Sequence, residues 1–309
     1  MTAFDTLKSI EYGSFSPSLA FAGIDVVNTD YSYAAGKAVM YYYRLKLSGD
    51  DGRWSFPALF CRPKGNGPFP AVVNIGFERN VPNKYLPLEE IIDNGFAIAY
   101  FCYEDVISDS ASFEDGIGEL THFDDNRPGK IAIWAWAASR VLDSLRSFTD
   151  CSFSSYSVLG HSRLGKTALL AGAEDSRFSC VISNDSGCSG AALFRGKKGE
   201  RIEDITRSFP YWFAPGFRDY SGKDDELPFD QDVLLLQIVP RNLLIMSAEE
   251  DTWADPDAER RAFESVSGAF EKAGALAEYN VRDGRHYLSR QDWDKAMRFI
   301  RKSESLIDK

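Results

Sequence analysis

The fold is decided by the stretch Tyr156-Ser-Val-Leu-Gly-His-Ser-Arg-Leu-Gly-Lys166. Its apolar beginning predicts a buried strand, and the run from Thr167 to Ala173 directly after it predicts a helix. Between the two lies a tight turn bounded by glycines. A serine at the tip of such a turn exposes its hydroxyl, while the free N–H groups of the helix N-terminus point at the reacting atom. Ser162 is therefore the candidate nucleophile.

The glycines around Ser162 fit the pattern G-x-S-x-G only in part. Gly160 lies two residues before the serine, but Leu164 occupies the place two after it and Gly165 follows one place late. An alternative interpretation is that Ser162 only caps the helix in an ordinary strand-to-helix turn. The choice depends on whether the chain also supplies a base and an acid.

The length and composition predict one α/β domain over residues 1–309, and the charge bears on its partners. The hydrophobic content of 44% is enough for a sizeable core. The net charge of -11 argues against nucleic acid or an anionic membrane as a partner. The short basic run Arg195–Lys198 reads as a solvated loop.

The sequence also bears on location and redox state. No early segment resembles a secretory leader, and no apolar window reaches the length of a membrane span, so we expect a cytoplasmic protein. The five cysteines are an odd number without C-x-x-C spacing, which favours reduced structural thiols over disulfides or zinc: Cys61, Cys102, Cys151, Cys180 and Cys188.

The order of the predicted elements indicates the fold class. Two strands, Ala38–Leu47 and Trp54–Cys61, open the chain and are joined by a turn at Gly49–Gly52. After them strands alternate with helices: strands at 70–75, 96–102, 156–159, 180–183, 243–247 and 277–281, and helices at 87–93, 128–147, after Ser162, 256–272 and 290–302. This order predicts an α/β-hydrolase fold, with a mainly parallel central sheet, helices on both faces and antiparallel N-terminal edge strands.

One long segment breaks the alternation. Residues 187–240 are rich in glycine, proline and aromatic residues and include Phe209-Pro-Tyr-Trp-Phe-Ala-Pro215. An irregular insertion of this length in a compact domain is more often functional than a failed element. We expect a cap-like insertion before the strand that carries the acid.

Only three histidines are available as a base for Ser162. His286 lies in a turn between the last apolar strand and the final helix, where the order Ser, acid, His of an α/β-hydrolase requires it. His161 directly precedes the serine and leaves the backbone on another side, so a packing or anchoring role fits it better. His122 lies in an acidic loop before the nucleophile and is a weak candidate.

Two aspartates are candidates for the acid. Asp251 follows the strand 243–247 after a short turn, the usual place for the residue that orients the imidazole. Asp185 ends the preceding strand, from which a carboxylate could reach the same ring. We favour Asp251, and both remain open at this point because aspartates in such loops also cap turns.

Four blocks of sequence, in order along the chain, resemble the glucuronoyl esterases, carbohydrate esterase family 15: Gly160-His-Ser-Arg-Leu-Gly-Lys166, Asn184-Asp-Ser-Gly-Cys-Ser-Gly190, Phe209-Pro-Tyr-Trp-Phe-Ala214 and Glu250-Asp-Thr-Trp-Ala-Asp-Pro256. The helix Trp134-Ala-Trp-Ala-Ala-Ser-Arg140 fits as well. The resemblance covers roughly residues 70 to 290 and rests on the ordered set rather than on any one block.

The resemblance implies roles for further residues. Arg163 matches the arginine that helps to bind the oxyanion, Lys166 and Glu200 match residues that bind uronate hydroxyls, and Trp253 matches the tryptophan that lines the sugar site. It also implies Ser162 as nucleophile, His286 as base, and Asp185 or Asp251 as acid.

We therefore expect a serine esterase that acts on a small carbohydrate ester, most simply a glucuronoyl ester, without metal or organic cofactor. The fold further predicts that the backbone N–H of Arg163 and one from the loop at Gly76 and Phe77 meet the oxyanion. The alternatives are a carbohydrate acetylesterase, such as an acetylxylan esterase, or a general carboxylesterase. From another class, a catalytically silent hydrolase fold that binds ligands is the alternative.

Overall fold

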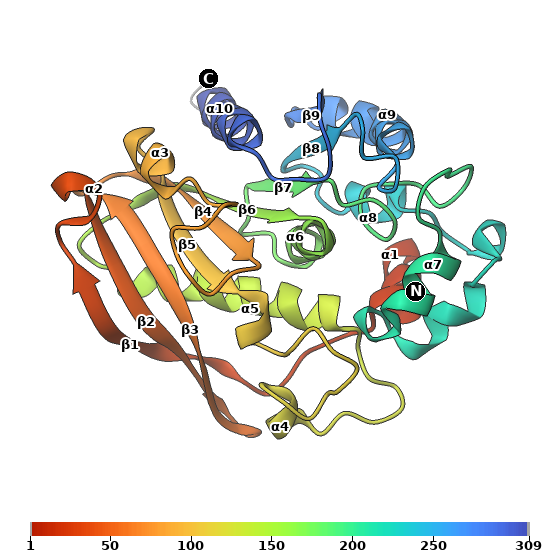
Figure 1. Ribbon diagram of the computed structural model, residues 1–309, viewed down its shortest axis with the longest axis horizontal. Coiled ribbons are helices and arrows are strands. Elements are labelled where there is room, and N and C mark those ends of the chain that lie inside the picture. Colours follow the sequence, from red (N-terminus) through yellow and green to blue (C-terminus); the bar gives the residue numbers. More distant parts are fainter. Residues whose placement is uncertain (1, 308–309) are drawn as a thin grey trace.

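A nine-stranded sheet forms the centre of the computed structural model, which describes residues 2–307 (Figure 1). The strands lie in the order β1-β2-β3-β5-β4-β6-β7-β8-β9. Their bounds are β1 Ala20–Asp30, β2 Ala38–Gly49, β3 Gly52–Pro63, β4 Phe69–Gly76, β5 Ala97–Cys102, β6 Phe153–His161, β7 Cys180–Asn184, β8 Asn242–Ala248 and β9 Ala277–Arg282. Neighbouring strands are parallel from β5 through β4, β6, β7 and β8 to β9. The pairs β1–β2, β2–β3 and β3–β5 are antiparallel. This arrangement confirms the expected fold class.

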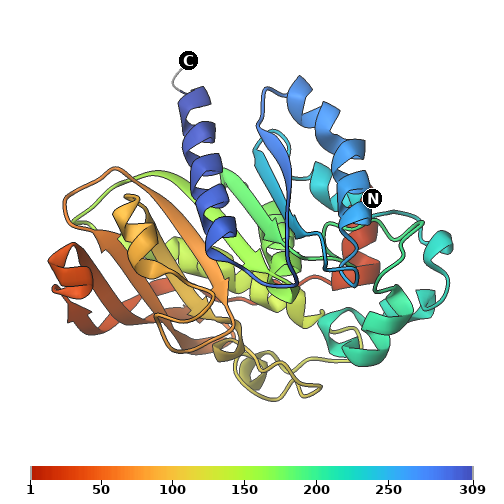
Figure 2. The ribbon, with the colours of Figure 1, turned by 45° about the horizontal axis from the view of Figure 1, so that its top comes forward.

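Helices cover both faces of the parallel part (Figure 2). Alternate side chains of the strands enter two separate cores, because successive residues of a strand point to opposite faces. One core packs against α5 Lys130–Ser144, α6 Arg163–Glu174 and α9 Pro256–Lys272, and the other against α3 Leu88–Asp93 and α10 Arg290–Ile307. Strands buried on both faces read as continuous apolar runs, which is why the sequence pattern located them.

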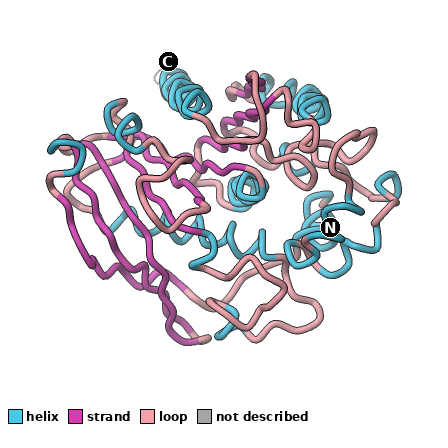
Figure 3. Tube along the Cα trace, in the orientation of Figure 1, coloured by secondary structure: helices cyan, strands magenta, loops and turns pink. Residues whose placement is uncertain are grey.

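The antiparallel strands β1 to β3 form a long twisted extension at one end of the sheet (Figure 3). The predicted turn is confirmed, since Gly49 pairs with Gly52 across the β2–β3 hairpin. Strand β1 was not predicted. It is the exposed edge strand and its register shifts between Phe21 and Gly23 and again between Val26 and Asn28, so its residues lack a regular alternation.

The segment between β7 and β8 contains α7 Ile202–Ser208, α8 Asp232–Leu236 and three short 3₁₀ helices, Pro210–Trp212, Pro215–Tyr220 and Asp224–Glu226. The N-terminal segment, α1 Ala3–Leu7 with the π-helical turn Lys8–Tyr12, packs beside it (Figure 1). Buried polar contacts join the two: Gln231 donates to both carboxyl oxygens of Glu11, and the Tyr12 hydroxyl donates to the Ser189 carbonyl at 2.7 Å. The N-terminus therefore supports the insertion.

Short elements complete the described chain. The helix α4 Gly118–Thr121 lies in the loop between β5 and α5, α2 Tyr33–Gly36 links β1 to β2, and 3₁₀ turns follow β5 at Tyr103–Asp105 and α5 at Leu145–Ser147. Within residues 2–307, no helix combines the length and the apolarity needed to cross a bilayer.

Candidate active site

Ser162 occupies the sharp turn between β6 and α6. Its φ of 59° and ψ of -127° place a non-glycine residue in a strained region of the backbone. Gly160 makes the turn possible, because a Cβ there would lie 1.9 Å from the carbonyl oxygen of Leu164. The turn lifts the serine hydroxyl off the end of the sheet and aims it away from the core.

The late second glycine also has a structural reason. Leu164 is fully buried in the core, whereas the close approach of α6 to its neighbours occurs one residue later. A Cβ on Gly165 would lie 3.0 Å from Cβ of Ser186 and 3.1 Å from the carbonyl oxygen of Asn184. The position that needs a glycine in this chain is therefore 165, and the departure from G-x-S-x-G leaves the turn intact.

The side chains of Ser162, His286 and Asp251 form a continuous hydrogen-bonded chain. His286 Nε2 lies 2.9 Å from Ser162 Oγ, and its Nδ1 lies 2.6 Å from Asp251 Oδ2. A carboxylate only accepts, so Nδ1 carries the proton and Nε2 offers its lone pair to the serine hydroxyl. Burial raises the pKa of Asp251, but the hydrogen bond and charge of His286 outweigh it and leave that pKa below the ordinary 3.8. The arrangement is that of a serine hydrolase triad.

Asp185, the other acid candidate, lies close by but does not bond His286. Its Oδ2 accepts from the Tyr287 backbone N–H at 3.3 Å and lies 3.6 Å from a guanidinium nitrogen of Arg282. Burial, together with the negative charges of Glu259 and Asp251, raises the pKa of Asp185 to about 8. A protonated carboxyl stabilises an imidazolium less than an ionised one does, so both geometry and charge favour Asp251.

The other two histidines take no part in the triad. His161 is 4% exposed, and its Nδ1 lies 2.6 Å from Asn184 Oδ1. Its ring lies 4.6 Å from that of His286, and burial plus the nearby His286 lower the pKa of His161 to about 3. It therefore stays neutral and packs against the base, the anchoring role predicted for it. His122 is exposed and lies in the loop of α4, beside a cavity that it shares with Phe113.

Three ligand-type side chains, His161, Asp185 and His286, approach one another within 4.8 Å and are the one such group among the described residues that could share a metal ion. Both ring nitrogens of His286 are already engaged by Ser162 and Asp251. Nδ1 of His161 is likewise engaged by Asn184. These side chains lie close together because His286 belongs to the triad and its neighbours pack around it.

The end of β4 and the loop after it hold Gly76 and Phe77, the residues predicted to offer a backbone donor to the oxyanion. Gly76 ends the strand against the ring of Tyr100, and a Cβ there would lie 2.1 Å from that ring. The backbone N–H of Phe77 has no hydrogen-bond partner within residues 2–307. The N–H of Arg163 opens α6, where first-turn N–H groups lack intrahelical acceptors. Neither N–H is bonded to a backbone acceptor in residues 2–307, and their role at the oxyanion stays a prediction.

The Arg163 guanidinium lies over the Trp212 ring, 4.7 Å from its centroid, and 5.7 Å from the Phe77 ring. It forms an ion pair with Asp109. Asp109 also accepts from Trp212 Nε1 at 2.7 Å and from the Tyr103 hydroxyl at 2.9 Å. Sequence reasoning missed Asp109, which comes from an irregular loop after β5 and stands in no motif.

The three residues implied for sugar binding gather beside the acid loop. Lys166 is 4% exposed and donates to the Ser186 carbonyl at 2.5 Å; burial lowers its pKa and the charge of Glu200 opposes that shift. The backbone N–H of Glu200 donates to the Trp253 carbonyl at 2.8 Å. The Trp253 side chain is 57% exposed, so its indole is presented to solvent from a residue whose backbone holds that of Glu200.

A buried glutamate that the sequence did not single out holds this part of the site. Glu259 of α9 is fully buried and accepts from the Gly187 N–H at 2.8 Å, from the Ser186 hydroxyl at 3.2 Å and from Ser247. It thus fixes the loop after β7, whose Ser186 carbonyl receives Lys166. The only signal was its place on the apolar side of a predicted helix, where glutamate is rarely buried unless paired.

Comparisons with known proteins agree with this geometry. A family model described as glucuronyl esterase, fungi, matches residues 46–274. Carbohydrate esterase MZ0003, from an unknown prokaryotic organism, is 37% identical over 235 residues, which are 69% of this chain and 54% of that protein. A 4-O-methyl-glucuronoyl methylesterase of Podospora anserina is 29% identical over 62% of this chain and 41% of its own length. The chain thus spans about half the length of these curated relatives.

Solved structures of esterases resemble this protein over nearly the whole chain. A promiscuous CE15 esterase from a marine bacterial metagenome and a glucuronoyl esterase from Solibacter usitatus each superpose with a TM-score of 0.85 at 27% identity. Each alignment covers 97% of this chain and 90% of the other chain. With the family model matching residues 46–274, well over half of the sequence, the chain belongs to the glucuronyl esterase family.

Proposed function

We propose that this protein hydrolyses esters of glucuronic acid through an acyl-enzyme on Ser162. The observation that carries the proposal is the preformed chain from Asp251 through His286 to Ser162, with hydrogen bonds of 2.6 and 2.9 Å. Such a chain is unnecessary in a protein that only binds a ligand. The family of the sequence, and relatives named 4-O-methyl-glucuronoyl methylesterases, support the uronate ester as substrate.

The reaction follows from the positions of the groups. Ser162 Oγ attacks the ester carbonyl while His286 Nε2 takes its proton, and Asp251 stabilises the resulting imidazolium. The carbonyl oxygen becomes an oxyanion that the N–H groups of Phe77 and Arg163 receive. His286 then gives its proton to the departing alcohol, which leaves the acyl group on Ser162.

Water completes the cycle. A water molecule gives a proton to His286 and attacks the acyl carbonyl, and collapse of the second oxyanion returns the proton to Ser162 Oγ and frees the acid. In a uronate ester the sugar belongs to the acyl group and stays attached to the serine. Lys166, Glu200 and Trp253 therefore contact the part of the substrate that remains bound through both steps.

A substrate panel tests the proposal. Wild-type protein and Ser162→Ala are assayed on methyl glucuronate, an acetylated xylo-oligosaccharide and p-nitrophenyl acetate. We expect turnover of methyl glucuronate that falls by orders of magnitude in Ser162→Ala with an unchanged circular dichroism spectrum, because triad members act as a unit. Turnover of the acetyl esters alone would transfer the assignment to a carbohydrate acetylesterase or a general carboxylesterase, and no turnover of any ester would leave a ligand-binding protein.

A further inference from the structure

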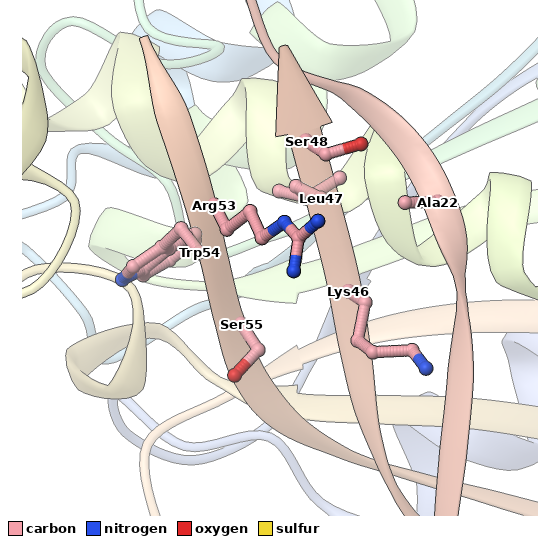
Figure 4. A pocket seen from close by; sticks show the side chains of 7 residues that line it. All are labelled: Ala22, Lys46, Leu47, Ser48, Arg53, Trp54 and Ser55. Atoms are coloured by element: carbon pink, nitrogen blue, oxygen red, sulfur yellow. The ribbon is translucent and has the colours of Figure 1, made fainter.

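A cavity that no triad residue lines lies on the outer face of the antiparallel extension. Its volume is about 540 Å³ and its lining includes Lys46, Ser48, Arg53 and Ser55. Figure 4 shows these side chains on adjacent strands β2 and β3, with the Arg53 guanidinium extending from β3 toward β2. The Trp54 indole points away from them, toward its stacking partner Phe56 at 5.2 Å. Ala22, Leu47 and Trp54 complete the lining, so two cations and two hydroxyls share the cavity with apolar surface.

The hollow results from small residues on the edge strand. Ser48 pairs with Ala20, and Lys46 pairs with Gly23 at the bulge that displaces Ala22. On this side of β1, Ala20 and Gly23 carry little or no side chain, and on β2 only Lys46 of their two partners is long. The sheet surface is therefore recessed between β1 and the Arg53 side chain, and the recess is open to solvent.

Three cations share this face because alternate residues of a strand point the same way: Arg44 and Lys46 on β2, and Arg53 on β3. Arg44 is fixed by Ser55, to which it donates at 3.0 and 2.7 Å. Lys46 pairs with Asp25 at 2.6 Å. Arg53 is exposed and has neither an ion pair nor a side-chain hydrogen bond to any residue from 2 to 307.

The basic face continues toward the active-site edge of the sheet. Tyr42, on the same face of β2 and 37% exposed, borders a smaller cavity of about 80 Å³ together with Pro57 and Arg79. Arg79 belongs to the loop after β4, the loop that offers the Phe77 N–H to the oxyanion. Arg79 itself pairs with Asp105 at 2.6 Å, so the Tyr42 ring and the Arg44 guanidinium are the groups that connect the recess with the border of this loop.

We propose that this face is a secondary binding site for a carbohydrate chain that carries free carboxylates. Arginine matches a carboxylate with two parallel hydrogen bonds, serine hydroxyls and an exposed tyrosine ring suit a sugar, and the ligand is of the kind that glucuronoyl ester cleavage releases. The inference extends the proposed function, because the released uronates remain on the chain whose neighbouring esters are still to be cleaved. Binding to this site would hold further esters near Ser162.

Other polyanions fit the molecule less well. The whole chain carries a net charge of -11, which repels a long phosphate backbone outside the recess. An oligosaccharide with one carboxylate every few sugars needs only the local cations. Binding of a single-stranded DNA oligonucleotide that Arg53→Ala abolishes would therefore overturn the assignment to carbohydrate.

Isothermal titration calorimetry in the Ser162→Ala background tests the site without turnover. The probes are a xylo-oligosaccharide with one free glucuronic acid and the uncharged oligosaccharide of equal length. For the acidic probe we expect a binding event that Arg53→Ala weakens by roughly tenfold or more, that added salt weakens, and that Trp253→Ala leaves in place. Arg298→Ala, which removes one exposed cation from α10, is the matched control and should change nothing.

Two results would overturn the site: an unchanged Kd in Arg53→Ala, or binding that Trp253→Ala alone removes, which would place the ligand at the triad. Turnover separates this failure from failure of the proposed function. Arg53→Ala should lower kcat/KM on an ester borne by a long acidic oligosaccharide and leave methyl glucuronate unchanged. If the wild-type protein did not hydrolyse methyl glucuronate at all, that result would contradict the esterase proposal and not the binding site.

Discussion

At the scale of single residues, the environment gives the two acidic candidates different charge states. Asp251 touches the imidazole and keeps a pKa below its ordinary value, because the contact with His286 outweighs burial. Asp185 is held by Tyr287 and Arg282, and burial raises its pKa to about 8. At neutral pH the first is ionised and the second is mostly protonated. Only Asp251 can therefore offer a full negative charge to an imidazolium.

The first prediction ranks these two carboxylates. Asp251→Asn should lower kcat by several orders of magnitude, because an amide can hold His286 in the wrong tautomer. Asp185→Asn should lower kcat far less, since an amide resembles the protonated carboxyl already present. Steady-state kinetics on methyl glucuronate measure both. The reverse ranking would assign the role to Asp185, and similar small losses would mean that the carboxylates share it.

The second prediction concerns Asp109 as a residue that positions Arg163. Asp109→Asn keeps one oxygen that can still accept from Trp212 Nε1, but it places an NH₂ group where Oδ2 meets the Tyr103 hydroxyl and removes the charge that pairs with the guanidinium. Since Arg163 would act on the oxyanion, we expect kcat to fall about tenfold or more with little change in KM. Asp125→Asn, in an exposed loop, is the control. A rise in KM at constant kcat would show that Asp109 instead shapes the substrate site.

The sequence allowed Ser162 and His286 to be predicted and limited the acid to Asp251 or Asp185, because each of these residues stands at or shortly after the end of a strand that periodicity locates. Asp109 could not be predicted in this way. It follows β5 inside an irregular loop, and its partners Arg163 and Trp212 come from segments about 54 and 103 residues away. Nothing local marks such a contact. Residues that position catalytic groups through long-range pairs become visible only once the chain is folded.

At the scale of elements, glycines distinguish the helix surface that packs on the sheet from the helix surface that faces solvent. Gly172 in α6 lies against β7, where a Cβ would lie 2.3 Å from a methyl group of Val181. Gly268 in α9 has no atom within 4 Å of the same position. Both residues are helical, so they differ in packing rather than in backbone conformation.

The third prediction uses this pair. Gly172→Ala should destabilise the protein by about 1–3 kcal/mol through overpacking against β7. Gly268→Ala should stabilise it by about 0.5–1 kcal/mol, because alanine restricts the unfolded chain and favours the helix. Chemical denaturation of both variants measures the difference. Equal effects of the two substitutions would mean that α6 does not approach the sheet as closely as described.

Elements that face the core could be predicted from the sequence more completely than exposed ones. The helix 256–272 was predicted with its observed bounds, since Asp255 caps it and Pro256 opens it. The helix predicted at 128–147 begins at Lys130 and is α-helical only to Ser144, after which it tightens into a 3₁₀ turn. Strand β1 was missed because an exposed, bulged edge strand shows no clear alternation. Patterns reveal elements through the core they face.

At the scale of the whole molecule, the N-terminal segment supports the insertion through a buried acid. Glu11 is fully buried beneath Gln231, and burial raises its pKa to about 8. In the unfolded chain the same carboxyl has a pKa near 4.5. Between these values the folded state holds a proton that the unfolded state has lost. The Glu11 contribution to stability therefore falls as pH rises from about 4.5 to about 8 and is constant above that range.

The fourth prediction follows from this sign. Glu11→Gln is neutral at every pH, so it should flatten the decline in unfolding free energy between about pH 5 and pH 8. Glu89→Gln, on the exposed side of α3, should leave the decline unchanged. Denaturation at a series of pH values measures both curves. A slope in Glu11→Gln equal to that of the wild type would assign the pH dependence to other buried acids such as Asp185.

The central claim is that Ser162 attacks a glucuronoyl carbonyl and carries the sugar acid as an ester. Rapid acid quenching of the protein with methyl glucuronate, followed by intact-mass and peptide mass spectrometry, observes that intermediate directly. We predict a glucuronoyl adduct on the peptide that contains Ser162, formed during turnover and absent from Ser162→Ala. Turnover of the ester with no adduct in the wild type even at the shortest quench times, together with undiminished activity in Ser162→Ala, would contradict the account.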